Sequence, residues 1–241
     1  MAGHSRENQF NILLLVLQDY GIVQKLGAIV ADNASPNNTL CDFIEDYMLK
    51  KEDQEWKAKH WQICCIGHII NLAVQAFLFA DVFEIEELES YDDEDKKGEK
   101  RDEEAKRIKF RLMGPLGKMH NIIIHIHGST AQITEFLELA GRLIPLDNHT
   151  RWNSWYKMLL VAIALRAAIE KYCQNHESDL EEDELTPEDW RWLHTIKEFL
   201  EPFNQATLYT EGDSAAIDQV LFTMDILIKH FQISLVSRAP F

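Results

Sequence analysis

Apolar side chains in the first third of the chain recur either with the period of a helix or in two short runs. The helical period over residues 7–20 predicts an amphipathic helix. The runs at 26–31 and 61–66 predict two short strands, and each is followed by a helical pattern, over about 36–50 and 68–79. A strand, a turn and a helix in that order, used twice, is typical of a small α/β sheet.

Helical periodicity dominates the rest of the chain. Residues 105–140 are predicted to be helical, although Ile122–Ile126 has the composition of a strand and periodicity does not decide between the two. Ser129 and Gln132 have the spacing of a capping box, which predicts a helix that ends near residue 140. Further helices are predicted at 153–173, 187–200 and 214–233. The pattern therefore favours a small sheet domain interrupted by a helical insertion.

The formal net charge of −16 is unusual for a protein that binds DNA, but the acidic residues are not spread evenly. Residues 81–104 hold thirteen acids and four bases, and residues 175–189 hold eight acids and no Lys or Arg. The remaining sequence is close to neutral. Blocks of this kind are typical of solvated, mobile loops, and neither block favours nucleic-acid binding.

The sequence contains neither a membrane span nor a secretory signal. No run of eighteen apolar residues occurs, and the first residues lack a basic start followed by an apolar core. The four cysteines show no framework spacing, so we expect reduced thiols inside a cell. The apolar content of 46% is enough to fill the core of one large domain or two small ones.

Four short motifs follow one another along the chain. They are Ala-Asp-Asn-Ala-Ser at 31–35, Cys-Ile-Gly-His at 65–68, Gly-Pro-Leu-Gly-Lys at 114–118 and Thr-Arg-Trp-Asn-Ser-Trp-Tyr at 150–156. In this order and rough spacing they resemble the ribonuclease H-like catalytic domain of hAT-superfamily DNA transposases, especially those of filamentous fungi. The resemblance extends from about residue 8 to residue 231.

The resemblance implies a helix-rich α/β fold, namely an incomplete ribonuclease H-like core with an all-α insertion. Residues 1–149 would form the partial core, including the acidic loop 81–104, and residues 150–241 the truncated helical insertion. Because the domain would be incomplete, we expect Phe77–Phe79 to lie on an exposed apolar surface and the chain to associate with itself.

Asp32 directly follows the first predicted strand. A carboxylate at the carboxyl end of a strand in an open α/β sheet is placed to hold a metal ion, but Asp-Asn-x-Ser also forms an ordinary turn or helix cap. By resemblance, Asp32 is a catalytic and metal-binding residue, the second of three carboxylates that hold two Mg²⁺ or Mn²⁺ ions. Counterparts of the other two are missing, so we expect weak metal binding or none, and no strand cleavage.

Cys65 and His68 match the Cys-x-x-His element of the family, where the histidine lies near the active site and the transposon end. By resemblance, His68 is a catalytic residue and Cys65 is a DNA-binding residue. There are two alternative interpretations of this pair. It is half of a zinc site, or it is a buried cysteine beside a histidine at the start of a helix. Arg151 and Trp152 match the family's Arg-Trp element, whose tryptophan stacks on a base flipped out of DNA. By resemblance, both are DNA-binding residues. Trp152 and Trp155 are also spaced as two core aromatics on one helix face.

Two further histidines, His125 and His127, would share a face if their segment were a strand. We expect ordinary buried or surface histidines there rather than metal ligands. No nucleophilic triad and no phosphate-binding loop is recognisable, because the glycines at 114–118 lack the spacing of a P-loop.

The resemblance implies a nuclear protein that binds DNA at transposon ends and at the flanking hairpin, as a truncated or inactive transposase derivative. Whether the chain is an enzyme stays open. One alternative is a helical protein-interaction module whose acidic loops bind basic partners. The other is a competent DNA transposase whose gene model is incomplete.

Overall fold

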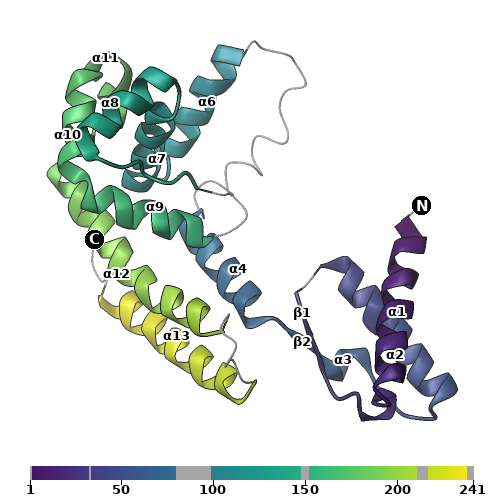
Figure 1. The fold of residues 1–241 in the computed structure, drawn as a ribbon. Coiled ribbons are helices and arrows are strands. Elements are labelled where there is room, and N and C mark those ends of the chain that lie inside the picture. Colours follow the sequence, from purple (N-terminus) through teal and green to yellow (C-terminus); the bar gives the residue numbers. More distant parts are fainter. Residues whose placement is uncertain (1, 33, 80–98, 148–151, 211–216, 238–241) are drawn as a thin grey trace. The chain divides into compact units, whose positions relative to one another are not determined.

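The computed structural model describes residues 2–32, 34–79, 99–147, 152–210 and 217–237 (Figure 1). The chain forms two compact units, which consist of residues 1–70 and 71–241. The sequence placed a domain boundary at 149–150 instead. Compactness and domain ancestry are different properties, so the expected division into core and insertion remains a prediction.

The first unit consists of helices packed beside two very short strands. Its elements are α1 (Ala2–Asp19), the 3-10 turn Val23–Lys25, β1 (Ile29–Ala31), α2 (Ser35–Lys51), α3 (Ala58–Trp61), β2 (Gln62–Cys64) and the first residues of α4 (Ile66–Leu78). Cys41, Ile44 and Met48 line the buried face of α2, and Phe10 of α1 packs against this cluster. The indole N–H of Trp56 donates a hydrogen bond to the carbonyl oxygen of Gly27 at 2.6 Å, which fastens the chain leading into β1.

The two strands are parallel, and Ala31 lies opposite Cys64. Both strands were predicted at the correct places but longer than they are. They pair only with each other among the described residues, which limits how far the ladder extends.

The second unit is entirely helical in its described part. Its elements after α4 are α6 (Glu99–Arg111), α7 (Pro115–Ile126), α8 (Thr130–Ala140), α9 (Trp152–Ala164), α10 (Arg166–Asn175), α11 (Glu177–Leu180), the 3-10 turn η2 (Glu181–Asp183), α12 (Pro187–Thr210) and α13 (Ile217–Ser237). Helix α7 lies at its centre and contacts α6, α8, α12 and η2.

Burial of α7 on most sides explains the ambiguous stretch Ile122–Ile126. The segment is helical, so its strand-like composition was misleading. A helix that contacts neighbours all round carries apolar side chains with little periodicity, and composition alone then resembles a strand. The predicted N-cap and helix end are confirmed, since Ser129 Oγ accepts a hydrogen bond from the Gln132 main-chain N–H at 3.3 Å and α8 ends at Ala140.

The apolar end of α4 is covered rather than exposed. The ring of Phe77 lies 4.4 Å from that of Phe199, and the ring of Phe79 lies 5.2 Å from that of Trp155. Leu78 is buried. The expectation of an exposed surface at these three residues was therefore wrong, because α9 and α12 supply the covering side chains.

The motif at 114–118 has a structural explanation. Gly114 caps α7 with a φ of +62°, a conformation that glycine adopts without strain, and Pro115 follows at the first helical turn. A Cβ atom on Gly117 would lie only 1.6 Å from the carbonyl oxygen of Phe110 in α6. Gly117 thus permits the backbones of α6 and α7 to touch.

We expect Gly117→Ala to destabilise the second unit by about 1–3 kcal/mol or more, because α6 and α7 must move apart to accept the methyl group. Urea denaturation measures the change. Gly67→Ala is the matched control, since its Cβ would make only an ordinary 3.8 Å contact with Cys65 Sγ in a helix. The control should be neutral or stabilising by up to about 1 kcal/mol. Equal effects of the two substitutions would contradict the close-packing explanation.

Candidate functional site

The parallel strands bring the first two motifs to one edge of the sheet. Asp32 follows β1 and Cys65 follows β2, and the Cys65 N–H donates to the Ala31 carbonyl oxygen at 2.8 Å. His68 lies in the first turn of α4, directly after this edge. The expected placement of Asp32, with the second strand beside it, is confirmed, while the catalytic roles of Asp32 and His68 and the DNA-binding role of Cys65 remain predictions.

The carboxylate of Asp32 is engaged in a turn. Its Oδ1 accepts hydrogen bonds from the Ala34 N–H at 3.0 Å and from the Asn37 side-chain amide at 2.7 Å. The same amide also contacts the Asp32 carbonyl oxygen at 3.3 Å. These bonds tie Asp32 to the start of α2, as in the turn interpretation of the motif.

A two-metal centre at Asp32 does not fit the residues that the structure describes. Within those residues, a single group of three His, Cys, Asp or Glu side chains is close enough to hold an ion, and Asp32 is not in it. Two divalent ions need several carboxylates around them. Asp32 as a ligand of Mg²⁺ or Mn²⁺ therefore stays a prediction.

Trp152 is a core residue in this structure. The residue is only 1% exposed, and its main-chain N–H donates to Asn71 Oδ1 at 3.1 Å. It shares the buried face of α9 with Trp155 and Tyr156. The expectation of an exposed aromatic at this helix start was wrong, and stacking on a base would require the indole to leave the core. Arg151 lies outside the described residues.

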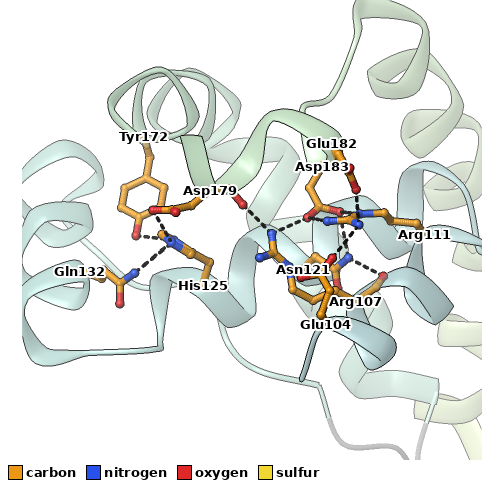
Figure 2. A network of polar contacts seen from close by, with 10 residues as sticks. All are labelled: Glu104, Arg107, Arg111, Asn121, His125, Gln132, Tyr172, Asp179, Glu182 and Asp183. Carbon is orange, nitrogen blue, oxygen red and sulfur yellow. Dashed lines mark hydrogen bonds and ion pairs between the residues drawn. The ribbon is translucent and has the colours of Figure 1, made fainter. Parts of the chain in front are cut away.

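The second acidic block contains the most buried carboxylate of this helical unit, Asp183, which is 0% exposed (Figure 2). Arg111 donates to it twice, from Nε at 2.8 Å and from Nη2 at 3.0 Å. Arg107 Nη2 donates at 2.7 Å, and the Asn121 side-chain amide donates at 2.8 Å. We call these four residues the Asp183 clamp. The prediction of a solvated loop over 175–189 was wrong here, because α11 and η2 dock on α6 and α7.

The charge of the preceding segment explains this docking. Residues 105–174 carry ten Lys or Arg and only four acids, so the acidic block has a basic surface to meet. Lys118 adds a further contact to Asp189 at 3.2 Å. The first acidic block differs from its prediction too, since residues 99–104 begin helix α6. Residues 80–98 lie outside the described part.

The contacts within the clamp shift the pKa values of Asp183 and Arg111. Burial by itself would raise the pKa of Asp183, but hydrogen bonds from Arg111, Asn121 and Arg107 outweigh it and hold that pKa below its ordinary value. The hydrogen bond to Asp183 in turn raises the pKa of Arg111. A carboxylate with these donors stays ionised in the interior. Truncating it would remove the buried counter-ion of Arg107 and Arg111 and leave Arg111 only the exposed carboxylates of Glu104 and Glu182.

A pocket of about 500 Å³ lies beside the clamp, and both polar and aromatic side chains line it. His120 lies in its wall between the rings of Phe110 and Trp155, at centroid distances of 3.9 and 5.0 Å. Its Nε2 lies 3.0 Å from Asp147 Oδ1, and both side chains are buried. Sequence reasoning missed this pair and the clamp. The only signal was the cluster of basic residues between 106 and 118.

His125 and His127 are separated by the helix rather than aligned by a strand. His125 Nδ1 lies 3.0 Å from the Tyr172 hydroxyl, while His127 Nε2 lies 2.8 Å from the Ile144 carbonyl oxygen. Burial lowers the pKa of His125, and the nearby His176 lowers it further. All four cysteines are free thiols, as expected.

Known proteins resemble the chain in part or along its length. A relative from the fungus Talaromyces stipitatus, named "Putative transcriptional regulator tpeD", is 26% identical over 238 residues. The alignment covers 96% of this chain and 27% of that protein, so the chain spans about a quarter of its relative's length. No solved structure matches the chain. Within the described residues, no helix has the length and apolar character needed to cross a membrane.

A family model described as the ZBED1 RNase-like helical domain matches residues 63–199. This region contains three of the four motifs and the whole Asp183 clamp. Its helical character agrees with the observed fold, in which the described part has only the β1–β2 pair as a sheet. Since the match covers more than half of the chain, this protein belongs to the family of the ZBED1 RNase-like helical domain.

Proposed function

We propose that this chain is the central part of a hAT-type, transposase-derived protein that binds DNA in the nucleus and does not cleave it by itself. The observation that carries the proposal is the family match over residues 63–199. This region includes the Cys-x-x-His, Gly-Pro-Leu-Gly and Arg-Trp motifs that resemble those of hAT transposases. The name of the Talaromyces relative, a transcriptional regulator, is in keeping with a nuclear role on DNA.

An incomplete ribonuclease H-like core is the finer part of this proposal. It is supported by the parallel pair β1–β2, which places Asp32 and Cys65 at one edge as such a sheet would. Strand cleavage is not included, because Asp32 belongs to no group of three potential metal ligands within the described residues. The Arg-Trp element would contribute through Arg151 and a phosphate, since Trp152 is occupied in the core.

The competing function is protein interaction through the acidic blocks. The structure withdraws two acids of the second block from this role and leaves its other six exposed. Asp183 is already bound by Arg107 and Arg111. Lys118 similarly holds Asp189. A carboxylate that is buried and paired within its own chain does not reach a basic partner.

The test is a titration of a labelled DNA hairpin with the purified chain, followed by fluorescence anisotropy. We expect the affinity to fall steeply between about 50 and 200 mM salt, because each phosphate contact releases a counterion. Arg151→Ala should weaken binding and reduce the salt slope by about one. The exposed Arg142, replaced in the same way, is the control and should leave both unchanged.

The same mixtures with Mn²⁺ should leave the DNA intact. Nicking that disappears on Asp32→Ala would establish an active transposase centre and overturn the non-cleaving part. Absence of any salt-dependent hairpin binding would overturn the DNA-binding proposal and favour the protein-interaction module.

A further inference from the structure

Two imidazoles and a carboxylate converge where α7, α10 and α11 meet. His125 lies near the end of α7, His176 follows α10, and Asp179 lies on α11. One ligand atom from each lies within 4.8 Å of the others, and His125 Nε2 is 3.8 Å from Asp179 Oδ2. Figure 2 shows the side chains of His125 and Asp179 turned toward one another. The group is unique of its kind in the described part of the chain.

The surroundings of these side chains hold them in place. The Tyr172 hydroxyl lies 3.0 Å from His125 Nδ1, and Nε2 lies on the side of Asp179. The side-chain amide of Gln132 also lies 3.1 Å from Nε2, and a bound ion would displace it. His176 Nε2 lies 2.8 Å from Glu135 Oε2, and the Asn175 amide donates to the other oxygen of Glu135 at 2.8 Å. A carboxylate that fixes a histidine ring is the arrangement found behind metal-ligating histidines.

The neighbouring clamp also fixes Asp179. Arg107 Nη2, which contacts the carboxylate of Asp183, donates to the main-chain oxygen of Asp179 at 2.8 Å. The side chain of Asp179 itself is 59% exposed, so an ion from solvent can reach it. The backbone of Asp179 is therefore held in place, and its carboxylate is accessible to an ion from solvent.

We propose that His125, His176 and Asp179 bind a Zn²⁺ ion, with Glu135 orienting His176. Imidazole nitrogens with one carboxylate oxygen suit zinc better than magnesium or calcium, which prefer oxygen ligands. Zinc bonds of 2.0–2.2 Å in a tetrahedron place ligand atoms about 3.3 Å apart, so the side chains need only close by about 1.5 Å or less. The fourth position is left to water. The ion fastens α7 to α10 and α11 and stabilises the helical unit.

This site is independent of the function proposed above, because none of its residues belongs to the DNA-binding motifs. It also differs from a Cys-x-x-His zinc site, since Cys65 and His68 belong to the other compact unit. The site could not be recognised from sequence spacing. Its two histidines are fifty-one positions apart and come close only in the folded chain.

The experiment is a titration of the purified full chain with Co²⁺ and then Zn²⁺. We expect one equivalent of Co²⁺ to produce the visible bands of a tetrahedral ion without thiolate charge-transfer absorption, and Zn²⁺ to replace it. Zn²⁺ should also raise Tm. His125→Gln, His176→Gln and Asp179→Asn should each remove the bands, and Glu135→Gln should weaken binding by about 10–100-fold.

Matched controls separate this site from others. The exposed His194→Gln and the thiol variant Cys65→Ser should bind Co²⁺ as the wild type does. Asp179→Asn is the decisive variant, because substitution of an exposed side chain leaves the fold intact. Thiolate bands, or Co²⁺ and Zn²⁺ binding unchanged in Asp179→Asn and His176→Gln, would overturn the proposal. So would a wild type that binds neither ion.

Discussion

Replacing Asp183 by alanine is expected to destabilise the helical unit by about 3–5 kcal/mol. The substitution removes the buried counter-ion of Arg107 and Arg111, of which only Arg111 keeps the exposed Glu104 and Glu182, and it removes one acceptor of the Asn121 amide. Urea denaturation followed by far-UV circular dichroism measures the loss. Glu181→Ala is the control, because this neighbouring acid is exposed and should change stability by no more than about 0.5 kcal/mol. Equal effects of the two changes would show that the clamp contributes nothing.

The same carboxylate makes the stability depend on pH. Its pKa is lower in the folded protein than the value of about 3.9 in an unfolded chain, so the unfolded state binds the proton more readily. The contribution of Asp183 is therefore present above the unfolded pKa and is lost as pH falls through the folded pKa. Denaturation between about pH 5 and pH 2 should show a smaller decline in Asp183→Asn than in the wild type.

Trp152→Ala is the other substitution with a large expected effect, a destabilisation of about 3–5 kcal/mol, because a fully buried indole leaves a cavity in the core of α9. Trp192→Ala is the matched control, since this indole on α12 is 41% exposed and its removal should cost much less. Thermal melts of both variants measure the difference.

Hairpin titrations alongside those melts distinguish a core role from base stacking. At a temperature where Trp152→Ala is folded, its DNA affinity should equal that of the wild type. A specific loss of about 1–3 kcal/mol in hairpin affinity with little change in Tm would contradict the core assignment and restore stacking on a base.

Local pattern was sufficient for the elements whose signals are local. The helix N-cap at Ser129 and both strand positions follow from neighbouring residues, and all are observed. Ile122–Ile126 failed because α7 is surrounded, and a surrounded helix loses the periodicity that identifies it.

The errors at the candidate site have a common physical origin. A run of acids is a solvated loop unless a complementary surface lies elsewhere in the fold, and the partners of Asp183 stand 62 to 76 positions before it. The burial of Trp152 likewise depends on the packing of α9 against α12, a helix distant in sequence. The motif order indicated a relationship that is in keeping with the ZBED1 RNase-like helical domain, while descent from a hAT transposase stays a prediction. The order of the motifs could not show which of the matched residues are buried in the core of this protein.

The long sequence separation between Asp183 and the two arginines also affects the order in which the unit folds. Helices α6 and α7 are adjacent in sequence, and Gly117 lets them pair closely, so they can form early. Asp183 must close a loop of 72 residues to reach Arg111, and the entropy of that closure is lost before the ion pairs form. The acidic turn therefore joins late, and weakening it should speed unfolding more than it slows folding. The ion pairs of Asp183 with Arg107 and Arg111 then fasten the finished helical unit and are not part of its folding nucleus.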